Sequence, residues 1–161
     1  MRKFVQFVAN KFAHNFKNPF NHLICGKKKQ KTRTMKKSTI EEIRERFDND
    51  VERFSNLETG QVATIDATIS LELITEASKR IVPNAVHVLD IGCGAGNYTL
   101  KMLSKLPNLN STLVDLSLPM LDRAFDRVSA ATNGKVEVKQ GDIREVELPE
   151  NHFDIILAGA V

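Results

Sequence analysis

Three glycines in five positions, directly behind an aspartate, are the residues of this sequence best suited to bind a small molecule. The stretch VLDIGCGAGNYTL, residues 88–100, ends an apolar run at Asp90 and continues with Gly92, Gly94 and Gly96. Glycine has no Cβ, so this loop can turn tightly at positive φ and let a ligand touch the backbone. A helix starting behind the loop would point free N–H groups at it, which suits a carboxylate or phosphate.

Two more aspartates follow later apolar runs. Asp115 ends STLVD, and Asp142 lies in GDI behind KVEVKQ. In an open parallel sheet, ligands bind outside the carboxyl ends of the strands, so we expect these two aspartates to share one rim with Asp90. An ionised carboxylate at Asp115 could accept hydrogen bonds from both hydroxyls of a ribose.

The spacing of the glycines distinguishes a dinucleotide-binding loop from other glycine-rich ligand-binding loops. A dinucleotide fingerprint, G-x-G-x-x-G, needs a glycine where this chain has Asn97, whereas the pattern D-x-G-x-G-x-G is complete from Asp90. An acid at Asp115 would also suit the ribose of NAD, so an NAD-binding module stays open as an alternative.

The order of elements around this loop predicts an α/β fold with a Rossmann-like parallel sheet, flanking helices and two preceding helices. Ser38 and Glu41 have capping-box spacing, which indicates the start of the first helix. Apolar periodicity predicts helices over 38–55, 63–82, 97–106 and 119–131, and strands over 85–91, 111–115, 135–140 and 152–161.

Residues 1–37 differ in charge from the rest of the chain. They contain eleven Lys/Arg and no acid, so a net charge of +3 divides into +11 there and −8 beyond. The apolar spacing over residues 4–16 predicts a weak basic amphipathic helix. A presequence, a membrane-surface anchor, an RNA-touching arm, or a start placed too early ahead of Met35 all remain open. A basic tail on an acidic body argues against a nucleic-acid-binding domain.

The remaining composition predicts a soluble globular protein in a reducing, cytoplasmic setting. Cys25 and Cys93 lie far apart, and neither has a second cysteine at metal-ligand spacing, so we expect no disulfide and no metal site. No stretch approaches the ~20 consecutive apolar residues of a membrane span.

Four motifs in order resemble the class I S-adenosylmethionine-dependent methyltransferases. They are VLDIGCGAGNY, LVDLS, VKQGDIRE and FDIILAGAV, within residues 86–161. The resemblance implies that S-adenosylmethionine is the cofactor. It also implies that Asp90 orders the loop and meets the methionyl ammonium, while Gly92 and Gly94 pass closest to the cofactor in a loop completed by Gly96.

The same resemblance assigns the other half of the cofactor. Asp115 would accept hydrogen bonds from the ribose hydroxyls, and Leu116 would lie against the adenine. Asp142 would accept a hydrogen bond from the adenine amino group, with Ile143 packing on the ring. The function implied is methyl transfer by in-line displacement, with a small-molecule acceptor; a non-catalytic cofactor-binding fragment of a truncated gene is the alternative.

The family sheet has seven strands, and the motifs here account for about four of them. We therefore expect a basic extension over 1–37 that is disordered or mis-annotated, a helical lid over 38–82, and a cofactor-binding core over 83–161 that is incomplete at its C-terminus. The fourth strand would be an exposed apolar edge, open to pairing with another chain. No catalytic residue is assigned, because the family handles its acceptor largely with residues behind that strand.

Overall fold

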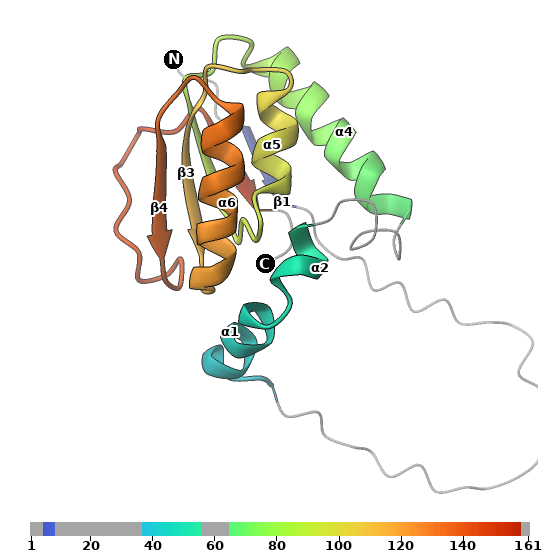
Figure 1. Cartoon of the computed structure of the whole chain (residues 1–161). Coiled ribbons are helices and arrows are strands. Elements are labelled where there is room, and N and C mark those ends of the chain that lie inside the picture. The colour runs from blue at the N-terminus through green and yellow to red at the C-terminus, as the bar shows by residue number, and fades with distance from the viewer. Residues whose placement is uncertain (1–4, 9–36, 56–64, 159–161) are drawn as a thin grey trace, which may run out of the picture.

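The fold is a single parallel sheet with helices on one face. The computed structural model describes residues 5–8, 37–55 and 65–158, with side chains from 37–55 and 69–158. The strands are β1 (Val5–Val8), β2 (His87–Ile91), β3 (Asn110–Asp115), β4 (Val136–Gln140) and β5 (Ile155–Ala158), in the order β1-β5-β2-β3-β4 (Figure 1). The predicted parallel α/β sheet is confirmed, including the four adjacent strands that carry the motifs.

The helices occupy two places around this sheet. α4 (Ile65–Ile81), α5 (Asn97–Leu103) and α6 (Leu118–Ala131) contribute to one apolar layer with the strands, whereas α1 (Ile40–Asp48) and α2 (Val51–Ser55) lie towards the carboxyl ends of the strands (Figure 1). Within the part of the chain described here, no helix is both long and apolar enough to cross a membrane.

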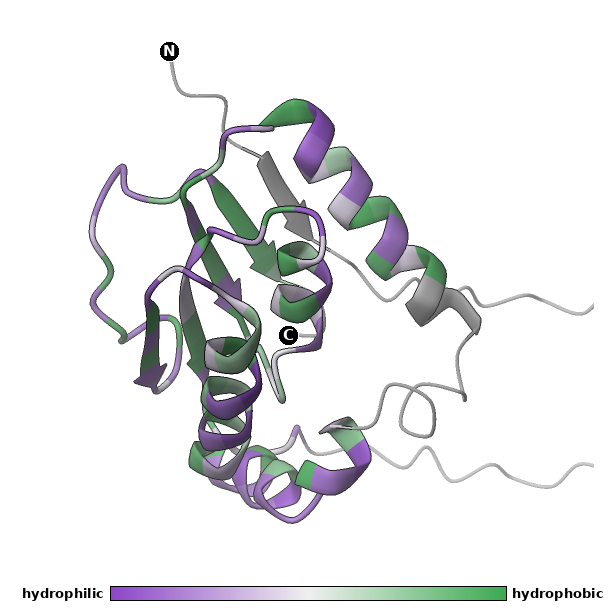
Figure 2. Cartoon of the chain, turned by 45° about the horizontal axis from the view of Figure 1, so that its top comes forward, coloured by the Kyte–Doolittle hydropathy of each residue, from purple (hydrophilic) through white to green (hydrophobic). Residues whose placement is uncertain are grey.

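Alternate residues of the central strands face two separate apolar layers. Val88 and Leu113 pack with the helices, while their neighbours Leu89 and Val114 pack with Phe153 on the other face. Because β2 and β3 are covered on both faces, all of their middle residues are buried. The edge strand β4 is largely exposed and mostly hydrophilic, as Figure 2 shows.

The first predicted helix differs from the prediction in two respects. Its capping box joins Thr39 and Glu42, one residue later than the predicted pair beginning at Ser38. The helix also ends at Asp48, so the single helix expected over 38–55 is two helices. Asn49 caps α1 through its backbone N–H and through its Nδ2, which donates to the Glu45 carbonyl at 2.8 Å.

The N-terminal region also corrects the prediction. Residues Val5–Val8, expected within an amphipathic helix, form β1 and pair in parallel with β5, from Val5 opposite Ile155 to Val8 opposite Ala158. The edge of β5 that we expected to be exposed is therefore paired within the chain. The physical reason is that an open edge presents unpaired N–H and C=O groups, and VQFV has the β-branched and aromatic residues that suit a strand. The rest of 1–36 lies outside the described residues.

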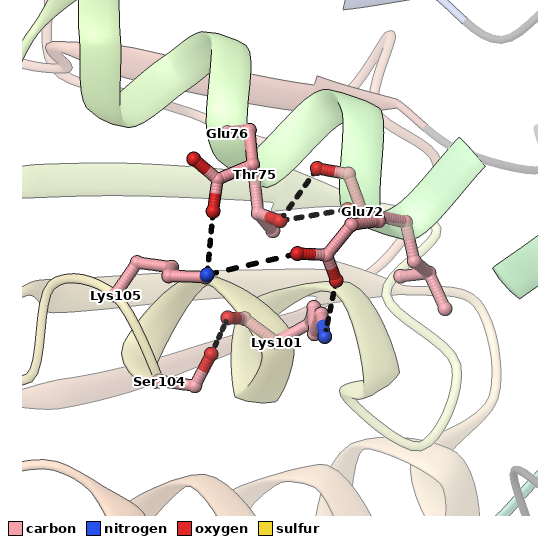
Figure 3. Close-up of polar contacts among 7 residues, drawn as sticks. Glu72, Thr75, Glu76, Lys101, Ser104 and Lys105 are labelled. Carbon is pink, nitrogen blue, oxygen red and sulfur yellow. Dashed lines mark hydrogen bonds and ion pairs between the residues drawn. The ribbon is translucent and has the colours of Figure 1, made fainter. Parts of the chain in front are cut away.

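Ion pairs join α4 to α5 at the surface, as Figure 3 shows. Lys101 Nζ lies 2.5 Å from Glu72, and Lys105 Nζ lies 2.5 Å from Glu76. Pairs this exposed contribute little to stability, because water screens the charges. The docking of α4 therefore depends mainly on its buried side chains, among them Leu71 and Ile74.

Replacing Gly96 tests the close approach of the glycine loop to α6. At Gly96, φ is 79°, and an added Cβ would lie 3.0 Å from Val128 Cγ2 and 3.3 Å from Ala124 Cβ. We expect Gly96→Ala to lower the free energy of unfolding by about 2–4 kcal/mol, from left-handed backbone strain and overpacking together. Urea unfolding measures it.

Gly94→Ala is the matched control for that substitution. Gly94 has φ of 51°, yet nothing lies within 4 Å of its added Cβ. Gly94→Ala should therefore lower the free energy of unfolding by only about 1 kcal/mol, from backbone strain alone. Equal losses for the two variants would contradict the packing argument.

Candidate functional site

The carboxylate of Asp115 joins the glycine loop to the end of the next strand. Its Oδ2 accepts a hydrogen bond from the Gly94 N–H at 2.8 Å, and its Oδ1 accepts one from the Ser117 N–H at 2.9 Å. The Gly92 and Cys93 N–H groups both donate to the Val114 carbonyl. The loop behind β2 and the carboxyl end of β3 thus form one connected rim.

The three glycines of the loop all adopt the left-handed backbone that their residue type permits. Their φ angles are 63° at Gly92, 51° at Gly94 and 79° at Gly96. Gly96 uses this freedom to pack against α6, whereas the space in front of Gly94 is open. Of these two glycines, Gly94 therefore leaves bare backbone where a ligand could approach.

Asp90 lies in the interior of the protein rather than at the mouth of the rim. Its side chain is 1% exposed, and its Oδ2 accepts a hydrogen bond from Thr99 Oγ1 at 2.7 Å. Burial raises the pKa of Asp90 to about 7, against the opposing effect of Thr99 and with a smaller contribution from the charge of Asp115. Asp90 therefore attaches the end of β2 to the first turns of α5.

Asp142 lies at the third strand end, held by a neighbouring arginine. Arg144 Nε donates to both of its carboxylate oxygens, at 2.9 and 3.0 Å, and these bonds lower the pKa of Asp142 to about 2. The Gly141 N–H donates to the Asp115 carbonyl at 3.0 Å. The third predicted acid is therefore ionised and joined to the same rim.

The two apolar residues predicted at the site occupy different surroundings. Leu116 is half-buried, and its carbonyl accepts a hydrogen bond from Gln140 Nε2 at 3.2 Å. Ile143 packs against the apolar layer that contains Leu89 and Val114. Both lie on segments that directly follow β3 and β4, next to the aspartates with which they were predicted to act.

Asn97 and Arg127 are site residues that sequence reasoning missed. Asn97 is buried at the start of α5, where its Nδ2 donates to the Phe54 carbonyl of α2 at 2.9 Å. Its Oδ1 accepts a hydrogen bond from Arg127, which also donates to the Ala95 carbonyl. Asn97 stood out only as a departure from the dinucleotide fingerprint, and nothing local to Arg127 signals its contact with a loop 30 residues earlier.

Cys93, between two of the glycines, does not have the properties of a nucleophile. It is buried, and burial together with the charges of Asp90 and Asp115 raises the pKa of its thiol. A reactive thiolate needs the opposite environment. Within 37–55 and 69–158, no group of three His, Cys, Asp or Glu side chains is placed to hold a metal ion.

Comparison with known proteins relates this arrangement to a family. Residues 88–161 match the family model described as "Methyltransferase domain". The matched residues are similar to methyltransferase domains. The resemblance seen in the motifs and the parallel α/β sheet agree with this similarity.

Curated relatives of this chain are longer than the chain itself. It is 29% identical over 118 residues to the malonyl-[acyl-carrier protein] O-methyltransferase of Priestia megaterium, covering 73% of this chain and 40% of that protein. It is 36% identical over 94 residues to the enzyme of the same name from Halalkalibacterium halodurans, covering 56% of this chain and 34% of that protein. The chain thus spans well under half the length of these relatives.

A solved structure shares the fold. The N-methyltransferase NodS from Bradyrhizobium japonicum WM9, in complex with S-adenosyl-L-homocysteine, superposes with a TM-score of 0.52 at 19% identity, covering 68% of this chain and 54% of that one. At this identity the similarity concerns the fold alone.

The buried carboxyl of Asp90 predicts a dependence of stability on pH. Its folded-state pKa of about 7 lies above the ordinary value of 3.8, so the folded protein keeps a proton that the unfolded chain releases. This contribution is fully present below about pH 4 and is lost as the pH rises to about 7. At pH 8, Asp90→Asn should therefore be more stable than the wild type, by up to about 4 kcal/mol.

Urea unfolding of both proteins between pH 4 and pH 8 checks this expectation. The quantity to follow is the difference between the two free energies of unfolding, because other carboxyl groups titrate equally in both. A difference that stays constant with pH would show that Asp90 is already ionised in the folded protein at pH 4.

Proposed function

We propose that this chain binds S-adenosylmethionine at the rim formed by the glycine loop, Asp115 and Asp142, and that the site serves methyl transfer. The observation that carries the proposal is the hydrogen bond from the Gly94 N–H to Asp115 Oδ2 at 2.8 Å, beside open space at Gly94. It brings a bare backbone and a carboxylate together at adjacent strand ends, where ligands of open parallel sheets bind.

The residues at this rim fit the chemistry of the cofactor. Each oxygen of Asp115 accepts one backbone N–H and keeps further lone pairs, so the carboxylate can still accept hydrogen bonds from two ribose hydroxyls. Asp142 is ionised and can accept a hydrogen bond from the adenine amino group if it shares its oxygens with Arg144. Leu116 and Ile143 offer apolar contact next to these two acids.

Asp90 has a different part in this proposal. Its carboxyl is buried and bonded to Thr99, so it supports the loop from below by attaching β2 to α5. We propose that it orders the glycine loop, and that it acts on the methionyl ammonium from beneath the loop rather than by direct contact. Gly92, Gly94 and Gly96 supply the conformation that lets the loop pass close to the cofactor.

The chemical step asks little of the protein beyond alignment. When bound, S-adenosylmethionine supplies a methyl carbon that is already activated by its sulfonium. The rim holds the donor in one orientation, and α1 and α2 lie towards the same ends of the strands, where they can limit the access of water. Holding two reactants in line supplies a large part of the acceleration of such a displacement.

For the acceptor we propose a small molecule, either free or attached to a carrier protein. The proposal is supported by the names of the two curated relatives, which are malonyl-[acyl-carrier protein] O-methyltransferases. A non-catalytic cofactor-binding function is the second candidate. Incubating the chain with methyl-labelled S-adenosylmethionine and malonyl-acyl-carrier protein separates the two, because only the first gives labelled product.

A binding comparison tests the cofactor directly. S-adenosylhomocysteine should raise the unfolding temperature of the full chain, because a ligand that binds only the folded state adds about 2.7 kcal/mol at a hundred times its Kd. NADH at the same concentration should leave the temperature unchanged. Stabilisation by NADH alone would assign the rim to a dinucleotide.

A pair of substitutions tests whether S-adenosylhomocysteine binds at Asp115. Asp115→Asn should weaken S-adenosylhomocysteine at least about tenfold, because the amide loses charge and can accept only one of the two backbone N–H groups. Asp126→Asn is the matched control, since Asp126 is exposed on α6. Equal affinities for the two variants in calorimetry would move the ligand away from this rim.

A further inference from the structure

The open edge of β4 has backbone groups left over for one more strand. β4 is last in the strand order, and among the described residues it pairs only with β3 (Figure 1). Directly before and after β4, the Lys135 carbonyl accepts a hydrogen bond from β3 and the Gly141 N–H donates one to β3. Successive residues of a strand point these groups to opposite edges. The odd-numbered residues of β4 therefore face β3, and the even-numbered ones, with Val138 at the centre, face the open edge.

Beside this edge, β4 exposes an apolar side chain on the helix face of the sheet. Val138 lies opposite Leu113 in the ladder, and Leu113 belongs to the apolar layer that the strands share with the helices. Paired residues point to the same face, so Val138 also points to the helix face. It is 42% exposed there. A valine at the centre of a strand is thus only half covered within the part of the chain described here.

The helix next to β4 adds further exposed apolar side chains. Leu118 and Phe125 lie two turns apart on one flank of α6, and they are 48% and 43% exposed. Arg127, on the opposite flank of the buried stripe of α6, donates to the glycine loop. Since α6 packs against β4, the apolar flank is turned towards that strand. Exposed apolar side chains gathered at one place mark an interaction surface.

On its other face, β4 carries two opposite charges placed symmetrically about its centre. Glu137 and Lys139 flank Val138 in the strand, so both side chains point away from the helices. If a second copy pairs antiparallel with its Val138 opposite this one, each Glu137 lies opposite Lys139 of the other copy. Opposite charges directly across antiparallel strands stabilise the pair, and like charges destabilise it. The edge is therefore complementary to itself.

We propose that the edge of β4 is a self-association surface, on which a second copy of this chain pairs antiparallel with Val138 opposite Val138. A two-fold axis then passes through this position, so the same surface serves both copies. The even-numbered residues bond the two sheets into one, and the apolar flanks of both α6 helices face each other on one side. Two Glu137–Lys139 pairs form on the other side. This association does not depend on the proposed cofactor function.

Sedimentation of the full chain over a concentration series tests the association. The mass should rise from the 18.1 kDa of one chain towards twice that value. Glu137→Lys should weaken the association at least about tenfold, because two attractive pairs become two repulsive ones. Adding Lys139→Glu to Glu137→Lys should restore it, since the exchange recreates both pairs. The matched control is Glu45→Lys, the same charge change on an exposed position of α1, which should leave the association unchanged.

A cysteine at the two-fold position tests the register. Opposite Cα atoms in a hydrogen-bonded antiparallel pair lie about 5.5 Å apart, which a disulfide can span. In a Cys25→Ser background, Val138→Cys should therefore give a disulfide-linked dimer on non-reducing gels after mild oxidation. Gln140→Cys is the matched control on the same face. The two copies of position 140 would lie about 13 Å apart, four residues along the strand, and should not crosslink.

Each alternative outcome contradicts a different part of the proposal. A chain that stays at 18.1 kDa throughout the series overturns the association itself. Association that Glu137→Lys leaves unchanged would place the contact on another surface. Loss of association in Glu137→Lys without recovery in the double exchange would overturn the antiparallel pairing. Equal crosslinking of Gln140→Cys and Val138→Cys would overturn the register centred on Val138.

Discussion

The hydrogen bond between the Gly94 N–H and the Asp115 carboxylate is the contact on which the site depends. It spans 2.8 Å between a loop behind β2 and the end of β3, and it is only partly exposed. Because the carboxylate also accepts the Ser117 N–H at the start of α6, one side chain sets the position of the loop and of that helix. Removing the charge would therefore alter the shape of the rim as well as its electrostatics.

A second constraint lies beneath the glycine loop, where the buried ionisable carboxyl of Asp90 lowers the stability of the protein. The sheet interior would accommodate an apolar residue at position 90 more easily than a carboxyl with its pKa raised to about 7. Buried polar groups that cost stability are common at functional sites, because the same group serves a ligand or an adjacent element. Here Asp90 bonds to Thr99 and so attaches α5 to the strand that begins the rim.

The sequence was a good guide to the position of residues that lie at the end of their own strand. Asp90, Asp115 and Asp142 could be placed after three strands because apolar runs mark strands and parallel strands share one rim. The docking of α1 and α2 was not predictable, because it depends on Asn97, Arg127 and Phe54, which lie far apart in sequence and carry no shared pattern. The β1 pairing was missed for a similar reason: the apolar spacing over residues 4–16 is compatible with a helix, and a nearby open strand edge decides otherwise.

Sequence alone thus determined the parallel α/β fold, the glycine loop and the three acids, since each rests on local periodicity or on residue type at one position. Only the tertiary structure decided which of these parts are buried and which contact one another. It buried Asp90, turned Asp115 towards Gly94 and joined Asp142 to Arg144. The physical reason is that burial and hydrogen-bond partners depend on which distant segments meet, and no local pattern encodes that meeting.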